Sequence, residues 1–201
     1  MNKITSHGII CFTFDDSHYG NWIKAMPLFA EYKAEASFFF SGTVDQAMLD
    51  AMKILQHEGH SIGLHTLTHA DAPPYFQEYG QEAYIQNEIL PQYEICIENG
   101  IKVQSFAYPN NRRTPETDQV LQPYFTLFRA GVGNLKDCSL AECDPLYRDV
   151  DALQEDRVMA SAGIGEFYHT RTDDLLNAIR RAARDNKIIS FFSHDIYPDA
   201  P

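Results

Sequence analysis

The chain has 201 residues, 44% of them hydrophobic and 22% charged, which suits one folded domain with a sizeable core and is too short for two. Asp and Glu outnumber Lys and Arg by 28 to 16, giving a formal net charge of −12. Long-range repulsion therefore disfavours nucleic acid and anionic membranes as partners, and a neutral or weakly cationic substrate is favoured.

Short apolar runs alternate with amphipathic ones along the chain. Runs rich in β-branched and aromatic residues predict strands at 8–14, 36–40, 61–65, 103–108, 125–130 and 188–192, and a short strand at 157–160. Helices are predicted at 21–32, 45–58, 78–99, 114–121 and 172–186. Asp45 and Thr172 are the expected N-caps, and Gly59 and Gly100 the expected C-terminal caps.

Strand followed by helix, repeated without a long break, predicts parallel strands joined by right-handed crossovers. The strands are continuous hydrophobic runs, which indicates that both faces are covered. A closed or nearly closed β/α barrel fits best. A doubly wound open sheet is the alternative, but no Gly-rich phosphate loop follows any strand.

The cysteines and the absence of a long apolar run complete the description of the sequence. Residues 135–165 are the least readable stretch, and they contain Cys138 and Cys143. We expect free thiols, with a short disulfide or a metal site as the alternatives. No apolar run approaches about 18 residues and no signal peptide precedes the first strand, so we expect a cytoplasmic protein or an exported one whose leader is absent.

Polar side chains gather where the predicted strands end, and the carboxyl ends of the strands carry the chemistry in a β/α barrel. These segments are Thr13-Phe-Asp-Asp16, His65-Thr-Leu-Thr-His69, Phe106-Ala-Tyr-Pro-Asn-Asn111 and Ser193-His-Asp195. We therefore expect acids and imidazoles to meet on one rim of the barrel.

The adjacent acids Asp15 and Asp16 most simply form a polar turn after the strand. Two carboxylates at the mouth of an apolar strand also repel each other unless a cation lies between them. Side chains of adjacent extended residues diverge, so one acid can bind a metal while the other faces the substrate. That arrangement provides a ligand and a base.

His65 and His69 are four residues apart, a spacing that lets two imidazoles reach one metal ion. Taken alone, they could equally be polar loop residues. With Asp16 they form a set of two histidines and one carboxylate, which leaves coordination positions open, as a catalytic metal requires. His194 is the remaining candidate proton donor, since the barrel places it opposite Asp15, although a lone histidine is more often structural.

These residues resemble, in order and spacing, the motifs of the polysaccharide deacetylase family, also called the NodB-homology or carbohydrate esterase 4 group. The resemblance runs from about Ile9 to His194 and includes Ala36-Ser-Phe-Phe-Phe40 and Gly59-His-Ser-Ile-Gly63. It implies a distorted barrel of about seven strands, with residues 1–201 forming a single NodB-like domain.

The resemblance also implies roles for the residues. Asp16, His65 and His69 would bind one divalent metal, zinc first, with cobalt, manganese or nickel as alternatives. Asp15 would be the general base and His194 the general acid. The main-chain N–H of Asn110, and Tyr108, are candidates for oxyanion or substrate contacts.

The sequence departs from the family pattern at several positions. Ala107 stands where the family often has an arginine that holds the base, and Arg112, Arg113 and Arg129 are the alternatives for that charge. The family's Asp-Trp element, which tunes the catalytic histidine, is absent: the only Trp, Trp22, lies elsewhere. For the carboxylate beside His194 the first candidates are Asp149 and Asp151.

Seven residues follow His194, where family members usually continue into another helix, so a truncated domain and a missing closing segment are the alternatives.

The sequence predicts a metal-dependent hydrolase that removes N-acetyl groups from an amino-sugar polymer or oligosaccharide. An amidohydrolase of the same fold acting on a small nitrogen compound is the first alternative. A carbohydrate-binding relative without catalysis is the second, but it would need neither Asp15 nor His194. A sugar isomerase would require more carboxylate ligands. The expected partner is an acetylated sugar chain, without nucleic acid or membrane insertion.

Overall fold

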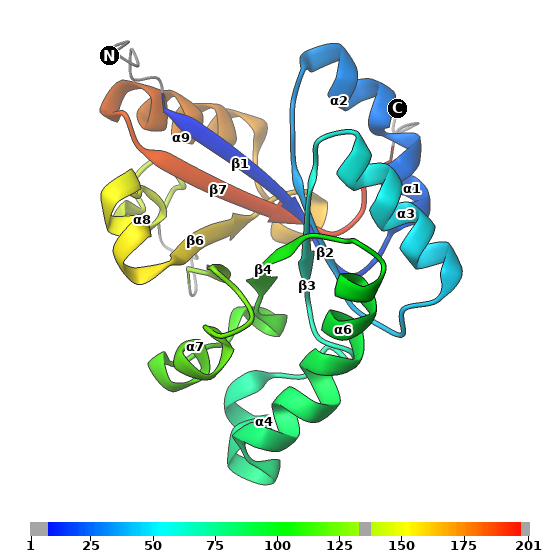
Figure 1. Cartoon of the computed structure of the whole chain (residues 1–201). Coiled ribbons are helices and arrows are strands. Elements are labelled where there is room, and N and C mark those ends of the chain that lie inside the picture. Colours follow the sequence, from blue (N-terminus) through cyan, green and yellow to red (C-terminus); the bar gives the residue numbers. More distant parts are fainter. Residues whose placement is uncertain (1–7, 133–137, 198–201) are drawn as a thin grey trace, which may run out of the picture.

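Seven parallel strands close into a barrel in the computed structural model, which describes residues 8–132 and 138–197 (Figure 1). Neighbours in the chain pair with one another, and β1 pairs with β7 to complete the ring. The strands are β1 (Ile9–Phe14), β2 (Ser37–Phe40), β3 (Ser61–Leu64), β4 (Val103–Ala107), β5 (Leu127–Gly131), β6 (Val158–Gly163) and β7 (Ile188–Ser193). The predicted closed barrel is confirmed, and the open sheet is excluded because β1 and β7 would be its unpaired edges.

The helices lie around the outside of the barrel (Figure 1). They are α1 (Tyr19–Lys24), α2 (Met26–Tyr32), α3 (Gln46–His57), α4 (Ala72–Tyr79), α5 (Gln81–Tyr84), the π-helix η1 (Ile85–Ile89), α6 (Leu90–Glu98), α7 (Pro115–Leu121), α8 (Val150–Asp156) and α9 (Thr172–Asp185). Short 3₁₀ turns are η2 (Pro109–Asn111), η3 (Asp144–Leu146) and η4 (Glu166–Tyr168).

Prolines explain two differences from the predicted helices. The helix predicted at 21–32 is divided at Ala25, and Pro27 falls in the first turn of α2, where its missing N–H costs nothing. The unpredicted helix α4 begins Ala72-Pro73-Pro74, again with proline in the first turn. These prolines, which suggest loops in the sequence, therefore lie at the starts of helices α2 and α4.

The expected caps are confirmed at three of four positions. The Asp45 side chain accepts a hydrogen bond of 2.8 Å from the Met48 N–H, and Gly59 and Gly100 follow their helices with positive φ. Thr172 is wrong as an N-cap, because it lies inside the first turn of α9 and Arg171 occupies the cap position. Two acids in that first turn supply the negative charge that the helix terminus favours.

Aromatic and aliphatic side chains from strands and helices form two hydrophobic clusters. The larger includes Trp22, Phe38, Phe40 and Phe106, all fully buried. All four cysteines are free, as expected, and Cys138 and Cys143 form neither a disulfide nor part of a metal-binding group among the described residues. Within the same part of the chain, no helix is both long and apolar enough to cross a bilayer.

Gly63 tests how tightly the barrel is packed. A Cβ at this position would lie 2.4 Å from the Phe39 ring and 2.7 Å from Ser105 Oγ, so we expect Gly63→Ala to lower the free energy of unfolding by about 1–3 kcal/mol. Exposed Gly20 in α1 is the matched control, since its Cβ would meet nothing within 4 Å; there alanine should raise that free energy by about 0.5–1 kcal/mol. Urea unfolding measures both. A Gly63→Ala variant as stable as the wild type would contradict the packing described here.

Candidate active site

The two acids after β1 diverge, as the sequence predicts. Asp15 is buried in the mouth of the barrel, whereas Asp16 is partly exposed and faces the loop after β3. The chain turns here with positive φ at Asp16 and Ser17. Ser17 Oγ donates to the Ser41 carbonyl at 2.6 Å and accepts from its N–H at 2.9 Å, which fixes the turn against the end of β2.

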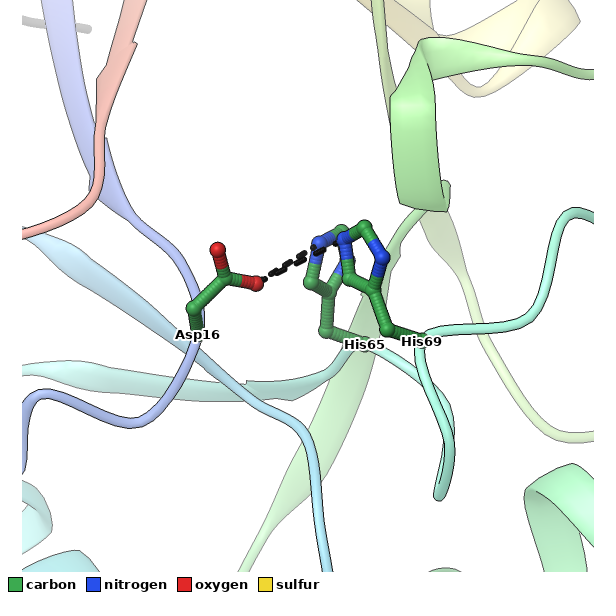
Figure 2. A group of neighbouring side chains, drawn as sticks. All are labelled: Asp16, His65 and His69. Atoms are coloured by element: carbon green, nitrogen blue, oxygen red, sulfur yellow. Dashed lines mark ion pairs between the residues drawn. The ribbon is translucent and has the colours of Figure 1, made fainter.

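Asp16, His65 and His69 converge on one point, and Figure 2 shows the carboxylate pointing at both imidazole rings. Asp16 Oδ1 lies 3.5 Å from His65 Nε2 and 3.6 Å from His69 Nε2. Ligand atoms of a tetrahedral zinc ion with bonds of about 2.0–2.2 Å lie about 3.3–3.6 Å apart. Asp16 Oδ1 is buried and has no hydrogen-bond partner among the described residues. The three side chains therefore fit a divalent metal ion.

His65 is held in the tautomer that a metal ligand needs. Its Nδ1–H donates to the Ala107 carbonyl at 2.7 Å, which leaves the Nε2 lone pair facing Asp16. Burial lowers the pKa of His65 to about 3, so the ring is neutral at any ordinary pH. His69, on the outer side of the site, is partly exposed and has a positive φ.

A buried arginine holds Asp15. Arg129 Nη2 lies 2.5 Å from Asp15 Oδ2, and the guanidinium lies over the rings of Phe39 and Phe192, at 5.6 and 4.6 Å from their centroids. Its Nη1 donates to Asn111 Oδ1 at 2.9 Å. The Asp15 carboxylate thus has a charged partner within a largely apolar setting.

This contact decides which arginine supplies the charge missing at position 107. Ala107 on β4 pairs with Arg129 on β5, and partners in parallel strands share a face, so Arg129 enters the lumen beside the expected position. Arg112 instead binds Asp71, and Arg113 binds Asp118. Of the three alternatives, Arg129 alone contacts Asp15.

Burial raises the pKa of Asp15 above its usual value, while the positive charge of Arg129 opposes part of that rise. Arg129 occupies Oδ2, and buried Oδ1 has no partner among the described side chains. Asp15 Oδ2 also lies 4.0 Å from His65 Nε2. One carboxylate oxygen therefore remains available beside the candidate metal ligands Asp16, His65 and His69.

His194 lies at the same rim, next to the second carboxylate oxygen of Asp16. Its Nε2 is 3.5 Å from Asp16 Oδ2, and its ring lies parallel to the Tyr168 ring at a centroid distance of 6.0 Å. The indole N–H of Trp22 donates to the His194 carbonyl at 2.8 Å. Trp22 does not match the family's Asp-Trp element, yet it anchors the main chain that carries the histidine.

Asp149 and Asp151 are wrong as partners of His194. Asp149 binds the Lys187 ammonium at 2.6 Å, and Asp151 lies in the first turn of α8. Lys187 precedes β7 and His194 follows it, so the six-residue strand separates them by about 20 Å. Among residues 8–132 and 138–197, Asp16 is the acid whose carboxylate lies within 4.0 Å of the His194 imidazole.

The turn after β4 differs from expectation in one residue. The ring of Tyr108 is fully buried, and its hydroxyl donates to Asp118 at 2.7 Å, so this side chain offers no polar atom to a substrate. Asn110 has a positive φ, and its main-chain N–H has no acceptor within the described residues. Its side chain donates to Asp71 at 3.0 Å. The Asn110 N–H remains a candidate oxyanion donor.

The site opens into a cavity of about 600 Å³ that includes the acids, the histidines and an aromatic wall. A second cavity of about 720 Å³ adjoins it and shares four lining residues, namely Asn110, Asn111, Tyr168 and Phe192. Sequence reasoning missed Asn111, Tyr168 and the aromatic rings around Arg129. Asn111 stands in the Asn-Asn pair already noted, but Tyr168 comes from the 3₁₀ turn η4, whose sequence has no distinguishing pattern.

Known proteins resemble this chain in sequence and in structure. The family model described as polysaccharide deacetylase matches residues 2–124. A chitin deacetylase of Arthroderma benhamiae is 37% identical over 76 residues, which are 35% of this chain and 20% of that protein. A peptidoglycan-N-acetylglucosamine deacetylase of Bacillus cereus is 34% identical over 83 residues, 41% of this chain and 37% of that protein. The similarity thus spans well under half of either relative.

Solved structures share the fold at low identity. A polysaccharide deacetylase of Bacillus cereus superposes with a TM-score of 0.56 and 17% identity, covering 95% of this chain and 81% of that one. A family 4 carbohydrate esterase of Streptomyces lividans, in complex with acetate, superposes with a TM-score of 0.53 and 17% identity, covering 91% of each chain. Both likenesses extend along nearly the whole chain.

Arg129→Met tests the ion pair, because methionine keeps an unbranched apolar side chain and removes the charge. Without the guanidinium, the pKa of Asp15 should rise further, so the acid limb of the activity profile should move up by about 1–3 pH units. The sign follows because a carboxyl group accepts a proton only when ionised. Arg113→Met is the control: it removes a paired guanidinium that does not touch Asp15. An unmoved acid limb in Arg129→Met would contradict the assignment.

Proposed function

The chain belongs to the polysaccharide deacetylase family, and we propose that it is a metal-dependent hydrolase that removes N-acetyl groups from an amino-sugar polymer or oligosaccharide. One observation carries the proposal: adjacent acids face two different partners. Asp16 faces two imidazoles at metal-ligand spacing, while buried Asp15 pairs with Arg129. A metal ligand beside a separate general base suits metal-assisted hydrolysis of an unactivated amide.

Asp16, His65 and His69 would hold the ion, with zinc the first candidate and cobalt, manganese or nickel as alternatives. When bound, such an ion polarises a carbonyl group and lowers the pKa of water toward about 7. The Ala107 carbonyl supports this role by orienting His65.

The remaining steps belong to the protein's own side chains. Asp15, through its unoccupied Oδ1, takes a proton from the water whose oxygen bonds to the acetyl carbon. Arg129 keeps the other carboxylate oxygen in place. The Asn110 N–H donates to the carbonyl oxygen as negative charge develops there.

His194 completes the reaction on the opposite side. In its protonated form it gives a proton to the sugar nitrogen as the C–N bond breaks, and acetate and a free amine are the products. Its position supports this role, because its Nε2 lies 3.5 Å from Asp16 Oδ2 and its side chain lines the same cavity as Asp15.

Two observations favour a sugar chain as the substrate. The relatives described above are named for chitin and for peptidoglycan N-acetylglucosamine, both built from acetylated amino sugars. The adjoining cavity also supports an extended ligand, since it continues from the site without leaving the rim. The small-molecule alternative was based on the missing arginine at Ala107, and Arg129 removes that argument.

Two variants distinguish the proposed metal ligands from the proposed general base. His65→Ala should abolish tight metal binding and acetate release from chitooligosaccharides, because it removes a ligand. Asp15→Asn should keep the metal while turnover falls by about 10² to 10⁴, the usual contribution of general-base catalysis. Metal analysis and acetate release measure both, with exposed Asp50→Asn on α3 as the control. Wild-type turnover by metal-free protein would refute metal dependence.

His194→Ala tests whether His194 is the general acid or has only a structural role. We expect hydrolysis of an N-acetyl amide to fall far more than hydrolysis of 4-nitrophenyl acetate, because nitrophenolate leaves without a proton and an amine does not. The ratio of kcat/KM on the two substrates is the measurement. Equal losses on both would assign His194 to the metal or the fold instead.

A further inference from the structure

The segment between the two metal-binding histidines has no regular structure of its own. Two histidines four residues apart face the same way when a helix carries them. Here residues 65–70 belong to neither strand nor helix, and Thr66 and His69 both have positive φ, a conformation that side chains other than glycine rarely adopt. Something outside this loop must therefore hold it.

One buried residue makes three hydrogen bonds to the loop. Glu88 Oε2 accepts from the Thr68 N–H at 2.9 Å, and its Oε1 accepts from the Thr68 hydroxyl at 2.8 Å. The Glu88 carbonyl accepts from the Leu67 N–H at 3.0 Å. Glu88 is only 4% exposed whereas Thr68 is exposed, so losing these part-buried bonds would leave a buried carboxylate without its partners, which is costly.

Glu88 lies in the π-helix η1, between α5 and α6. A π-turn inserts one residue into a helix, alters which side chains face the core, and occurs often at functional sites. Gln92, four residues further along, is also buried, and its amide donates to the Gly42 carbonyl at 2.7 Å. The Gly42 N–H in turn donates to the Leu67 carbonyl at 3.0 Å. Both polar residues of this buried helix face thus act on the loops at the rim.

We propose that Glu88 is a positioning residue of the metal centre: by binding Thr68 and Leu67 it fixes the loop on which His65 and His69 meet Asp16. The inference rests on the proposed metal site and extends it to a helix that does not reach the cavity. Partners that orient metal ligands typically change metal affinity by about 10–100-fold when they are lost.

The test compares Glu88→Ala with Glu88→Gln by titrating zinc into metal-free protein against a competing chelator. We expect Glu88→Ala to weaken the zinc Kd by about 10–100-fold and to alter the visible spectrum of the cobalt-loaded protein. Glu88→Gln should restore most of the affinity, because its carbonyl oxygen can accept from the Thr68 N–H while the Thr68 hydroxyl turns to accept from the amide.

A second pair keeps the inference testable if Glu88→Ala does not fold. Thr68→Val keeps the shape of the side chain and removes the hydroxyl donor to Glu88, so the zinc Kd should weaken. Thr68→Ser keeps the hydroxyl and should bind zinc like the wild type.

His60→Ala is the matched structural control. His60 is also buried, at 6% exposure, and its Nδ1 accepts from the Ala36 N–H at 3.1 Å, but it precedes β3 at the opposite end of the barrel. We expect a lower Tm with the wild-type zinc Kd and cobalt spectrum.

Three results would overturn the inference. The first is a wild-type zinc Kd and cobalt spectrum in Glu88→Ala or, if that variant does not fold, in Thr68→Val. The second is a loss of affinity in His60→Ala as large as that in Glu88→Ala, which would indicate general destabilisation. The third is wild-type protein that binds no divalent ion, which would refute the proposed metal centre itself.

Discussion

The ion pair between Asp15 and Arg129 is the contact on which the geometry of the rim depends. A charged pair inside a barrel is costly to desolvate, and here Asp15 Oδ1 and Arg129 Nε are buried without a hydrogen-bond partner among the described residues. Two aromatic rings lie against the guanidinium, and Asn111 accepts one of its N–H groups. Gly131 makes that last contact feasible, because a Cβ there would lie 2.7 Å from Asn111 Cγ.

Once Asp15 is turned into the barrel, the next residue has to turn out. Asp16 then meets the loop after β3, where His65 is oriented by the Ala107 carbonyl and where Glu88 holds the segment between the histidines. The two adjacent aspartates thereby acquire different surroundings: Asp15 is buried beside the Arg129 guanidinium, and Asp16 faces two imidazoles. This is how one short turn can serve as both a base and a ligand.

Backbone strain is concentrated at this rim. Ten non-glycine residues in the described part of the chain have positive φ, and six of them lie in loops that follow β1, β3 and β4, namely Asp16, Ser17, Thr66, His69, Asn110 and Asn111. Such conformations persist where the surrounding structure determines them, and here the closed barrel and the buried network around Glu88 and Gln92 provide that support.

The sequence by itself determined the barrel, the positions of its strands and most of the residues at the rim, because continuous apolar runs and strand-end polar residues are local patterns. It also singled out Asp15, Asp16, His65, His69 and His194 as candidate site residues, and all five line one cavity. Only the tertiary structure decided that Arg129 supplies the missing charge, since its position beside Ala107 depends on register between strands. The same holds for Glu88, a polar residue in a buried helix face whose partner lies 20 residues away. Asp149 failed as a candidate for the same reason: proximity in sequence does not reveal which end of a barrel a residue occupies.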